Sequence, residues 1–210
     1  MTRILIADDH AVVRHGLKHL VSEAAGMRVT GEASSGDEAL KMARSNRFDI
    51  AILDISMPGL GGLETLRRLG AEVPDLKVII LSMHPEEQYA IRCLKEGARA
   101  YLTKAGAPTE LVAAIRTVAQ GKRYITPSLA DALASSLGPA SREMPHERLS
   151  QREFEVLSRL GRGESARTIA DSLHLSVKTV GTYSARVRSK LGLRSTTDII
   201  RYAFRHGLAE

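Results

Sequence analysis

Five polar residues stand where apolar segments of this sequence end. Residues 50–53 are the clearest case, because an Ile-Ala-Ile-Leu run leads directly to Asp54 and a Pro/Gly-dense stretch, 55–62, then breaks the strand. The carboxyl ends of parallel strands meet at one edge of an open α/β sheet, where ligands bind. The residues that we expect at this edge are Asp8, Asp9, Asp54, Ser82 and Lys104.

These residue types suit phosphoryl chemistry on a carboxylate. Three carboxylates held close together stay ionised only with a cation among them, and oxygen ligands with open positions suit Mg²⁺. Lys104 and the hydroxyl of Ser82 would hold the oxygens of an incoming phosphoryl group, and Asp54 would accept it as an acyl phosphate. Singly, Asp8 or Ser82 could cap a helix and a lysine is usually solvated. Together, at matching strand ends, the five favour a pocket.

The elements that must position these residues alternate strictly. Apolar runs predict strands at residues 3–7, 27–33, 50–54, 77–82 and 99–102. Helical spacing predicts helices at about 12–21, 35–43, 62–69, 86–96 and 108–120. In the first of these helices, five residues would share one face: Val12, Val13, Leu17, Leu20 and Val21. Alternating strands and helices predict a doubly wound parallel sheet of flavodoxin-like (βα)5 type.

Composition divides the chain into a neutral part and a basic part. Of 30 Lys+Arg and 24 Asp+Glu, residues 1–121 hold 15 of each, so the whole excess of +6 lies after them. A basic second domain suggests a polyanionic partner. No apolar run approaches the roughly 20 residues of a membrane span, and no secretory signal is seen. The chain has a single cysteine, Cys93, which is consistent with a reducing cytosol. We expect Cys93 to be a small apolar residue of a helix.

Three segments follow from this reading. Residues 1–121 form the α/β domain, residues 122–146 a linker with a short helix at 128–137, and residues 147–210 an all-α domain. Within the linker, residues 138–145 are rich in Gly, Pro and Ser, a composition typical of a flexible connection.

The last segment has a helix-turn-helix pattern. Ser150 and Glu153 have the spacing of a capping box, Ser165 begins a short helix, and Ser176 caps a longer one reaching Leu191. On the longer helix, helical spacing points one set to the core: Val177, Val180, Val187 and Leu191. The opposite face carries Lys178, Thr182, Ala185 and Ser189.

This longer helix fits the major groove of DNA. Lys178 and Thr182 would lie near base edges, with basic side chains around them on phosphates. The candidate DNA contacts are Lys178, Thr179, Thr182, Arg186, Arg188 and Lys190. Taken alone, the helix would more often be an ordinary solvated basic helix.

The first 121 residues resemble the receiver domain of bacterial response regulators. The motifs that carry the resemblance are Ile6-Ala7-Asp8-Asp9-His10, Ile52-Leu53-Asp54-Ile55-Ser56-Met57-Pro58-Gly59, Leu81-Ser82 and Tyr101-Leu102-Thr103-Lys104. The resemblance implies that a sensor histidine kinase phosphorylates Asp54. It implies an Mg²⁺ site made by Asp8, Asp9, Asp54 and the backbone carbonyl of Ser56, and a switch pair, Ser82 and Tyr101. Many receivers have Pro after the pocket lysine, whereas Ala105 stands here, which leaves the geometry of that peptide bond open.

The C-terminal segment resembles the LuxR-type helix-turn-helix, and the combination is similar to the NarL/FixJ class of two-component transcription factors. The motifs are Leu149-Ser150-Gln151-Arg152-Glu153-Phe154, Ile169-Ala170-Asp171-Ser172-Leu173, Leu175-Ser176-Val177-Lys178-Thr179-Val180 and Lys190-Leu191. The resemblance implies a cytoplasmic regulator that binds double-stranded promoter DNA as a homodimer, with RNA polymerase as a candidate further partner. Gly181 and Tyr183 depart from the residues of many members, so the target sequence is not predicted.

The prediction is therefore a transcriptional regulator, not an enzyme, switched by phosphorylation of Asp54. One alternative is a phosphorylation-independent DNA-binding regulator whose receiver serves only for dimerisation; the intact acidic pocket argues against it. A second is an aspartyl-phosphate phosphohydrolase, but such enzymes usually carry another Asp two positions on, where Ser56 stands. A flavodoxin-like cofactor binder is a weaker alternative, since no phosphate-binding Gly/Ser/Thr loop follows the first strand.

Overall fold

The computed structural model describes residues 1–57, 59–83, 86–136, 144–173 and 175–208. The chain divides into two compact units, Met1–Gly138 and Pro139–Glu210. Among the described helices, none is long and apolar enough to cross a membrane.

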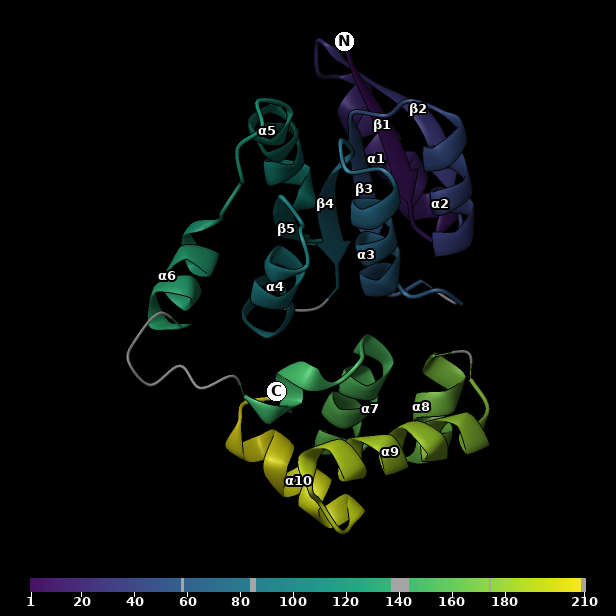
Figure 1. Cartoon of the computed structure of the whole chain (residues 1–210), viewed down its shortest axis with the longest axis vertical. Helices are drawn as coiled ribbons and strands as arrows, with labels where there is room; N and C mark the ends of the chain where they lie inside the picture. Colours follow the sequence, from purple (N-terminus) through teal and green to yellow (C-terminus); the bar gives the residue numbers. More distant parts are fainter. Residues whose placement is uncertain (58, 84–85, 137–143, 174, 209–210) are drawn as a thin grey trace. The chain divides into compact units, whose positions relative to one another are not determined.

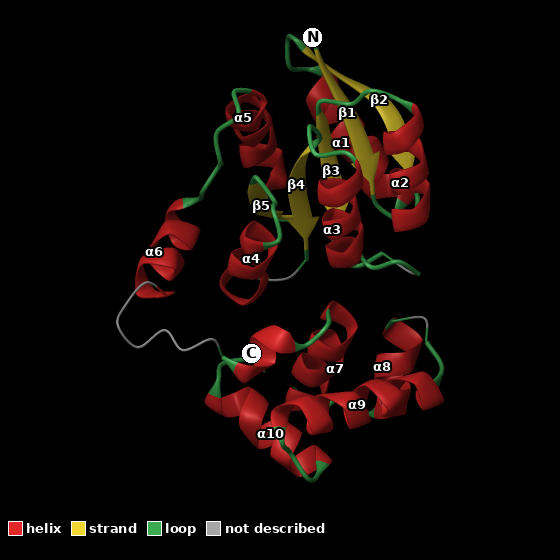
Figure 2. Ribbon diagram, viewed as in Figure 1, coloured by secondary structure: helices red, strands yellow, loops and turns green. Residues whose placement is uncertain are grey.

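The first unit is built on a parallel five-stranded sheet with the order β2-β1-β3-β4-β5 (Figure 2). The strands are β1 (Thr2–Ala7), β2 (Met27–Ala33), β3 (Ile50–Asp54), β4 (Lys77–Ser82) and β5 (Ala100–Thr103). The central strand β3 is buried along its whole length, as expected for a strand covered on both faces. This order confirms the predicted flavodoxin-like (βα)5 fold, and the predicted strand bounds differ from the observed ones by at most one residue at either end.

Five helices cover the two faces of this sheet (Figure 1). They are α1 (Ala11–Ser22), α2 (Gly36–Ser45), α3 (Gly62–Glu72), α4 (Glu86–Lys95) and α5 (Ala107–Ala119). Helices α1 and α5 pack against one face, where isoleucines of β1, β3 and β4 join Leu17, Leu111 and Ile115 in one apolar cluster. Helices α2 and α3 contact each other over the opposite face, and α4 contacts β5.

A sixth helix, α6 (Pro127–Ser136), follows the sheet and contacts α4. The residues before it extend the sheet edge, because the amide of Tyr124 donates to the carbonyl of Arg99 at 2.9 Å. Thr126 caps α6 by accepting from the amide of Leu129, and its own hydroxyl donates to the carboxylate of Glu86 on α4. The short helix predicted at 128–137 is thus present; Leu137 and residues 138–143 of the predicted linker lie outside the described residues.

The second unit is helical. It contains a short 3₁₀ helix, η1 (Pro145–Arg148), and the helices α7 (Gln151–Gly161), α8 (Ala166–Ser172), α9 (Val177–Leu191) and α10 (Thr196–Arg205). Serines cap α7, α8 and α9 as predicted, since Ser150, Ser165 and Ser176 each accept a hydrogen bond from a backbone amide three residues on. The predicted capping box of Ser150 and Glu153 is complete.

Two burial predictions were wrong. Val12 is 85% exposed and Val177 is 51% exposed, although both were assigned to core-facing stripes. Each lies in the first turn of its helix, where helical spacing gives the direction of a side chain but not whether a neighbouring element reaches that far. The prediction for Cys93 was correct: the thiol is buried, and burial raises its pKa to about 12.

Candidate functional site

The sheet brings four of the five predicted pocket residues to adjacent strand ends. In the register, Ala7 pairs with Leu53, so Asp8 follows β1 beside the end of β3. Asp54 pairs with Leu81, and Ser82 pairs with Thr103, which precedes Lys104. The carboxyl ends of β1, β3, β4 and β5 therefore deliver these side chains to one edge. Asp9 follows directly after Asp8.

Lys104 joins two of the carboxylates. Its Nζ lies 2.8 Å from Oδ2 of Asp8 and 2.9 Å from Oδ2 of Asp54. Both carboxylates are buried, with side chains only 1% exposed. Burial raises the pKa of Asp54, and the charge of Asp8 adds to that effect while Lys104 opposes it. Burial alone would lower the pKa of Lys104, but the two carboxylates outweigh it and hold this pKa above its ordinary value.

The acidic end of the pocket fits a divalent cation. One ligand atom from each of Asp8, Asp9, His10 and Asp54 lies within 4.8 Å of the others. Oδ2 of Asp8 and Oδ1 of Asp9 are buried and accept no hydrogen bond of suitable geometry, although each lies near a nitrogen of Lys104 or His10. Buried carboxylate oxygens that lack hydrogen bonds are what a bound cation satisfies, and a set dominated by oxygens suits Mg²⁺.

His10 is a member of this cluster that the sequence analysis did not identify. Its Nδ1 lies 2.9 Å from Oδ1 of Asp9 and 3.3 Å from Oδ1 of Asp8, while its side chain is 65% exposed. The sequence signal was simple proximity, because His10 directly follows the two acids.

The loop after β3 is held against Asp54 by backbone contacts. The amide of Ser56 donates to Oδ1 of Asp54 at 3.1 Å, and the amide of Gly62 donates to the carbonyl of Ile55 at 3.0 Å. A Cβ on Gly62 would lie 2.2 Å from the carbonyl oxygen of Asp54, so only glycine allows α3 to begin this close to the strand end. The loop therefore fixes the orientation of the Asp54 carboxylate. The peptide bond between Lys104 and Ala105 is trans.

The expected switch residues are both in the interior. Ser82, the last residue of β4, and Tyr101, in β5, are both fully buried. Burial raises the pKa of Tyr101, and a hydrogen bond with the side chain of Ser82 opposes that effect. Tyr101 is thus linked to Ser82, whose strand end borders the carboxylates.

In the second unit, α9 presents a basic face. Val180 and Val187 are buried, while Lys178, Thr182 and Arg186 are exposed. Ala185 and Ser189 are exposed as well, so the predicted outer face is present. Thr179 and Arg188 are half-buried. The guanidinium of Arg186 lies 6.0 Å from the centre of the Tyr183 ring, within range of a cation–π contact.

Lys190 makes a contact that sequence reasoning missed. Its Nζ lies 2.6 Å from Oε2 of Glu153, the buried acid of the α7 capping box. This ion pair joins α7 to the end of α9. In this conformation the ammonium of Lys190, which was predicted to contact phosphate, is therefore already paired with a carboxylate. Two residues 37 positions apart give no local signal for such a pair.

Comparison with known families agrees with this architecture. The family described as "Response regulator receiver domain" matches residues 4–116, and "Bacterial regulatory proteins, luxR family" matches residues 147–203. The chain belongs to the response regulators that combine a receiver domain with a LuxR-type DNA-binding domain, the NarL/FixJ class. It is a regulator of a two-component system and not an enzyme.

Its similarity to individual members spans the whole chain. The chain is 39% identical to the response regulator UvrY of Escherichia coli K12, over 99% of this chain and 96% of UvrY. It is 37% identical to the response regulator GacA of Pseudomonas aeruginosa PAO1, over 100% of this chain and 99% of GacA. Among solved structures, RcsB of Salmonella enterica serovar Typhimurium, bound to promoter rprA in the presence of the phosphomimetic BeF3−, superposes with a TM-score of 0.64. That match has 25% identity and covers 96% of this chain and 97% of RcsB.

Proposed function

We propose that this protein is a transcriptional regulator whose binding to promoter DNA is controlled by phosphorylation of Asp54 by a sensor histidine kinase. The observation that carries the proposal is the contact of Lys104 with both Asp8 and Asp54, at the strand ends of a chain that also carries a basic helix-turn-helix. Residues 1–121 would be the receiver, 122–146 the linker, and 147–210 the DNA-binding domain. The boundary between the two compact units, at Gly138 and Pro139, lies within the proposed linker.

The pocket supports phosphoryl transfer to a carboxylate. An oxygen of Asp54 attacks the phosphorus of a phosphohistidine on the kinase; the new O–P bond forms as the N–P bond breaks, and the histidine leaves with the bonding pair. Lys104 neutralises charge on the transferred oxygens, and the hydroxyl of Ser82 donates to one of them. Asp8, Asp9, Asp54 and the carbonyl of Ser56 would hold Mg²⁺, which would neutralise part of the charge on the transferred group.

The switch pair connects this reaction to the rest of the receiver. Acyl phosphate at Asp54 adds a charge of about −1.5 to −2 next to Ser82. The hydroxyl of Ser82 then has a stronger acceptor than its present contact with Tyr101, and a new hydrogen bond there moves the Ser82 side chain. Tyr101, which is buried beside it, must repack when Ser82 moves.

DNA recognition falls to α9. Lys178 and Thr182 would contact base edges, with Thr179 as a further DNA contact. Arg186 and Arg188 would contact phosphates, and Lys190 would join them on leaving Glu153. Pairing of two chains on promoter DNA is supported by RcsB, for which a structure of two dimers bound to two parallel DNAs exists. RNA polymerase is a further partner in this proposal, and the cytoplasm is its location.

A gel-shift titration on genomic fragments tests the proposal, with and without acetyl phosphate and Mg²⁺, comparing the wild type with Asp54→Asn. The expected result is tighter binding by the phosphorylated wild type only. Equal binding in every condition would instead leave a DNA-binding protein whose receiver acts independently of phosphate, for example in dimerisation.

A further inference from the structure

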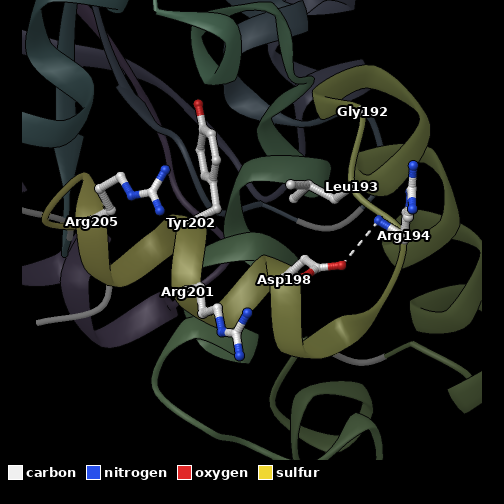
Figure 3. Close-up of a pocket in the computed structure, with 7 residues that line it drawn as sticks. All are labelled: Gly192, Leu193, Arg194, Asp198, Arg201, Tyr202 and Arg205. Carbon is white, nitrogen blue, oxygen red and sulfur yellow. Dashed lines mark hydrogen bonds between the residues drawn. The ribbon is translucent and has the colours of Figure 1, made fainter.

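A hollow on the second unit is lined by arginines that the proposed function does not use. Its volume is about 320 Å³, and it lies between the turn after α9 and one side of α10. Figure 3 shows Arg194 on that turn, with Arg201 and Arg205 on successive turns of α10. Its other lining residues are Gly192, Leu193, Asp198 and Tyr202.

The three arginines leave this hollow with excess positive charge. Within the described part of the chain, none of them forms an ion pair with a carboxylate, whereas Arg152 and Arg159 of the same unit are paired with Glu155 and Glu164. All three are exposed.

The one acid in the hollow is already engaged. The carboxylate of Asp198 accepts hydrogen bonds from the hydroxyl and amide of Ser195 and from the amide of Arg194. The hydrogen bonds from Ser195 and Arg194 lower its pKa. Because Asp198 is committed to capping α10, the arginines remain available to an anion from outside the chain.

The position of the hollow relative to α9 indicates which anion. Helix α9 has 15 residues, which is about 22 Å at 1.5 Å per residue. The major groove of B-DNA is only about 12 Å wide, so a helix of this length that crosses it reaches the phosphate backbone at its end. The hollow begins at Gly192, the residue that follows α9.

We propose that Arg194, Arg201 and Arg205 bind the sugar–phosphate backbone of DNA beside the groove that α9 enters. The inference rests on the proposed function of α9 and extends the DNA contact beyond it, to the turn and to α10. Such contacts position the protein on DNA and carry no sequence information. Arg205 also stands in the last turn of α10, where a cation complements the helix dipole, so stability is measured alongside binding.

The test is a salt series on the full-length chain with two duplexes, one selected by gel shift and one unrelated in sequence. The triple variant Arg194→Gln, Arg201→Gln, Arg205→Gln is compared with the wild type. Each phosphate contact contributes about 0.9 to the slope of log K against log salt, so three contacts lower the slope by about 2.7 for each bound chain. Between 50 and 200 mM salt the wild type should then lose about 40-fold more affinity than the variant for each bound chain.

Two matched controls complete the design. The triple variant Arg28→Gln, Arg47→Gln, Arg116→Gln removes the same charge from exposed, unpaired positions of the receiver and should keep the wild-type slope. The Arg→Lys triple variant at 194, 201 and 205 keeps the charge and should keep most of the slope. Thermal unfolding of all variants shows whether α10 is still folded.

The expected outcome is a reduced slope and equal weakening on both duplexes. An unchanged slope in a folded variant overturns the inference, and if Lys178→Ala weakens binding in the same assay, the proposed function of α9 survives that failure. If the Arg→Gln triple variant binds DNA like the wild type but supports less transcription by purified RNA polymerase, the inference is overturned. The arginines would then contact an acidic surface of a protein partner. A wild type that binds neither duplex overturns both proposals.

Discussion

Nζ of Lys104 lies 2.9 Å from Oδ2 of Asp54, and this contact joins the segment after β5 to the end of β3. The same ammonium lies 2.8 Å from Asp8, so one cation balances two buried carboxylates. The raised pKa of Asp54 shows that this balance is incomplete, because burial disfavours its ionised form more than Lys104 favours it. The cluster sets the carboxylates of Asp8, Asp9 and Asp54 against one ammonium, so a second cation would reduce its negative charge.

Removing the ammonium should destabilise the receiver. Lys104→Ala leaves Asp8 and Asp54 buried without their cation, and breaking a buried ion pair by removing one partner costs roughly 3–5 kcal/mol. We expect the free energy of unfolding in urea, with EDTA present, to fall by about this amount. Mg²⁺ should restore part of the loss. Arg47→Ala, at an exposed position of the same unit, serves as the control and should leave the stability unchanged within about 0.5 kcal/mol.

Magnesium should stabilise the wild type through the carboxylates. A ligand that binds only the folded state adds RT ln(1 + [L]/Kd), about 2.7 kcal/mol at one hundred times Kd. We expect Mg²⁺ to raise the melting temperature of the receiver and EDTA to abolish the rise. Asp9→Asn should reduce the Mg²⁺ response, while Asp49→Asn, whose carboxylate pairs with Arg3 outside the cluster, should keep it. An equal response in Asp9→Asn and the wild type would remove Asp9 from the proposed site.

Much of the pocket followed from the sequence, for a physical reason. Parallel strands with right-handed crossovers must end at a shared edge, so an apolar run that closes with Asp54 places its carboxylate there without any knowledge of tertiary contacts. Capping serines were equally predictable, since Ser150 and Ser176 act on amides three residues away. The first rule depends only on the topology of the sheet and the second only on residues close in sequence, so both can be applied without knowing tertiary contacts.

The features that escaped prediction depend on distances between elements. Val12 and Val177 lie on apolar stripes but in the first turns of their helices, where they are largely exposed among the described residues. Lys190 and Glu153, which pair across two helices, are 37 residues apart in the sequence. The arginine hollow forms because the turn at Gly192 brings Arg194 beside α10. Helical periodicity encodes none of these relationships.

The ion pair between Glu153 and Lys190 predicts a pH-dependent stability of the second unit. Burial raises the pKa of Glu153, but hydrogen bonds from Lys190 and Ser150 outweigh it, and the folded-state pKa lies below the ordinary value of about 4.3. The ionised carboxylate therefore stabilises the fold above pH of about 4.3, and this contribution is lost as the pH falls through the folded-state pKa.

Glu153→Gln isolates this charge, because glutamine retains the capping geometry. At pH 7 we expect the variant to be less stable by about 1.5–3 kcal/mol, the range for a hydrogen bond to a charged group. The difference should shrink towards zero at the acid end of the profile. Hydrogen exchange of the α7 amides across pH 3–7 measures it within the full-length chain, and a difference that stays constant over this range would contradict the assignment.

Three exposed positions of α9 should affect DNA binding in two different ways. Thr182→Ala and Lys178→Ala remove side chains that the proposal places at base edges, so the affinity for a selected duplex should fall by about 1–3 kcal/mol with little change on unrelated DNA. Arg186→Gln removes a proposed phosphate contact and should weaken both duplexes alike, with the salt slope reduced by about 1. Competition titrations with selected and unrelated duplexes separate the two effects. If Thr182→Ala and Lys178→Ala weakened both duplexes equally, α9 would contact the backbone and the base-reading element would have to be sought elsewhere in the second unit.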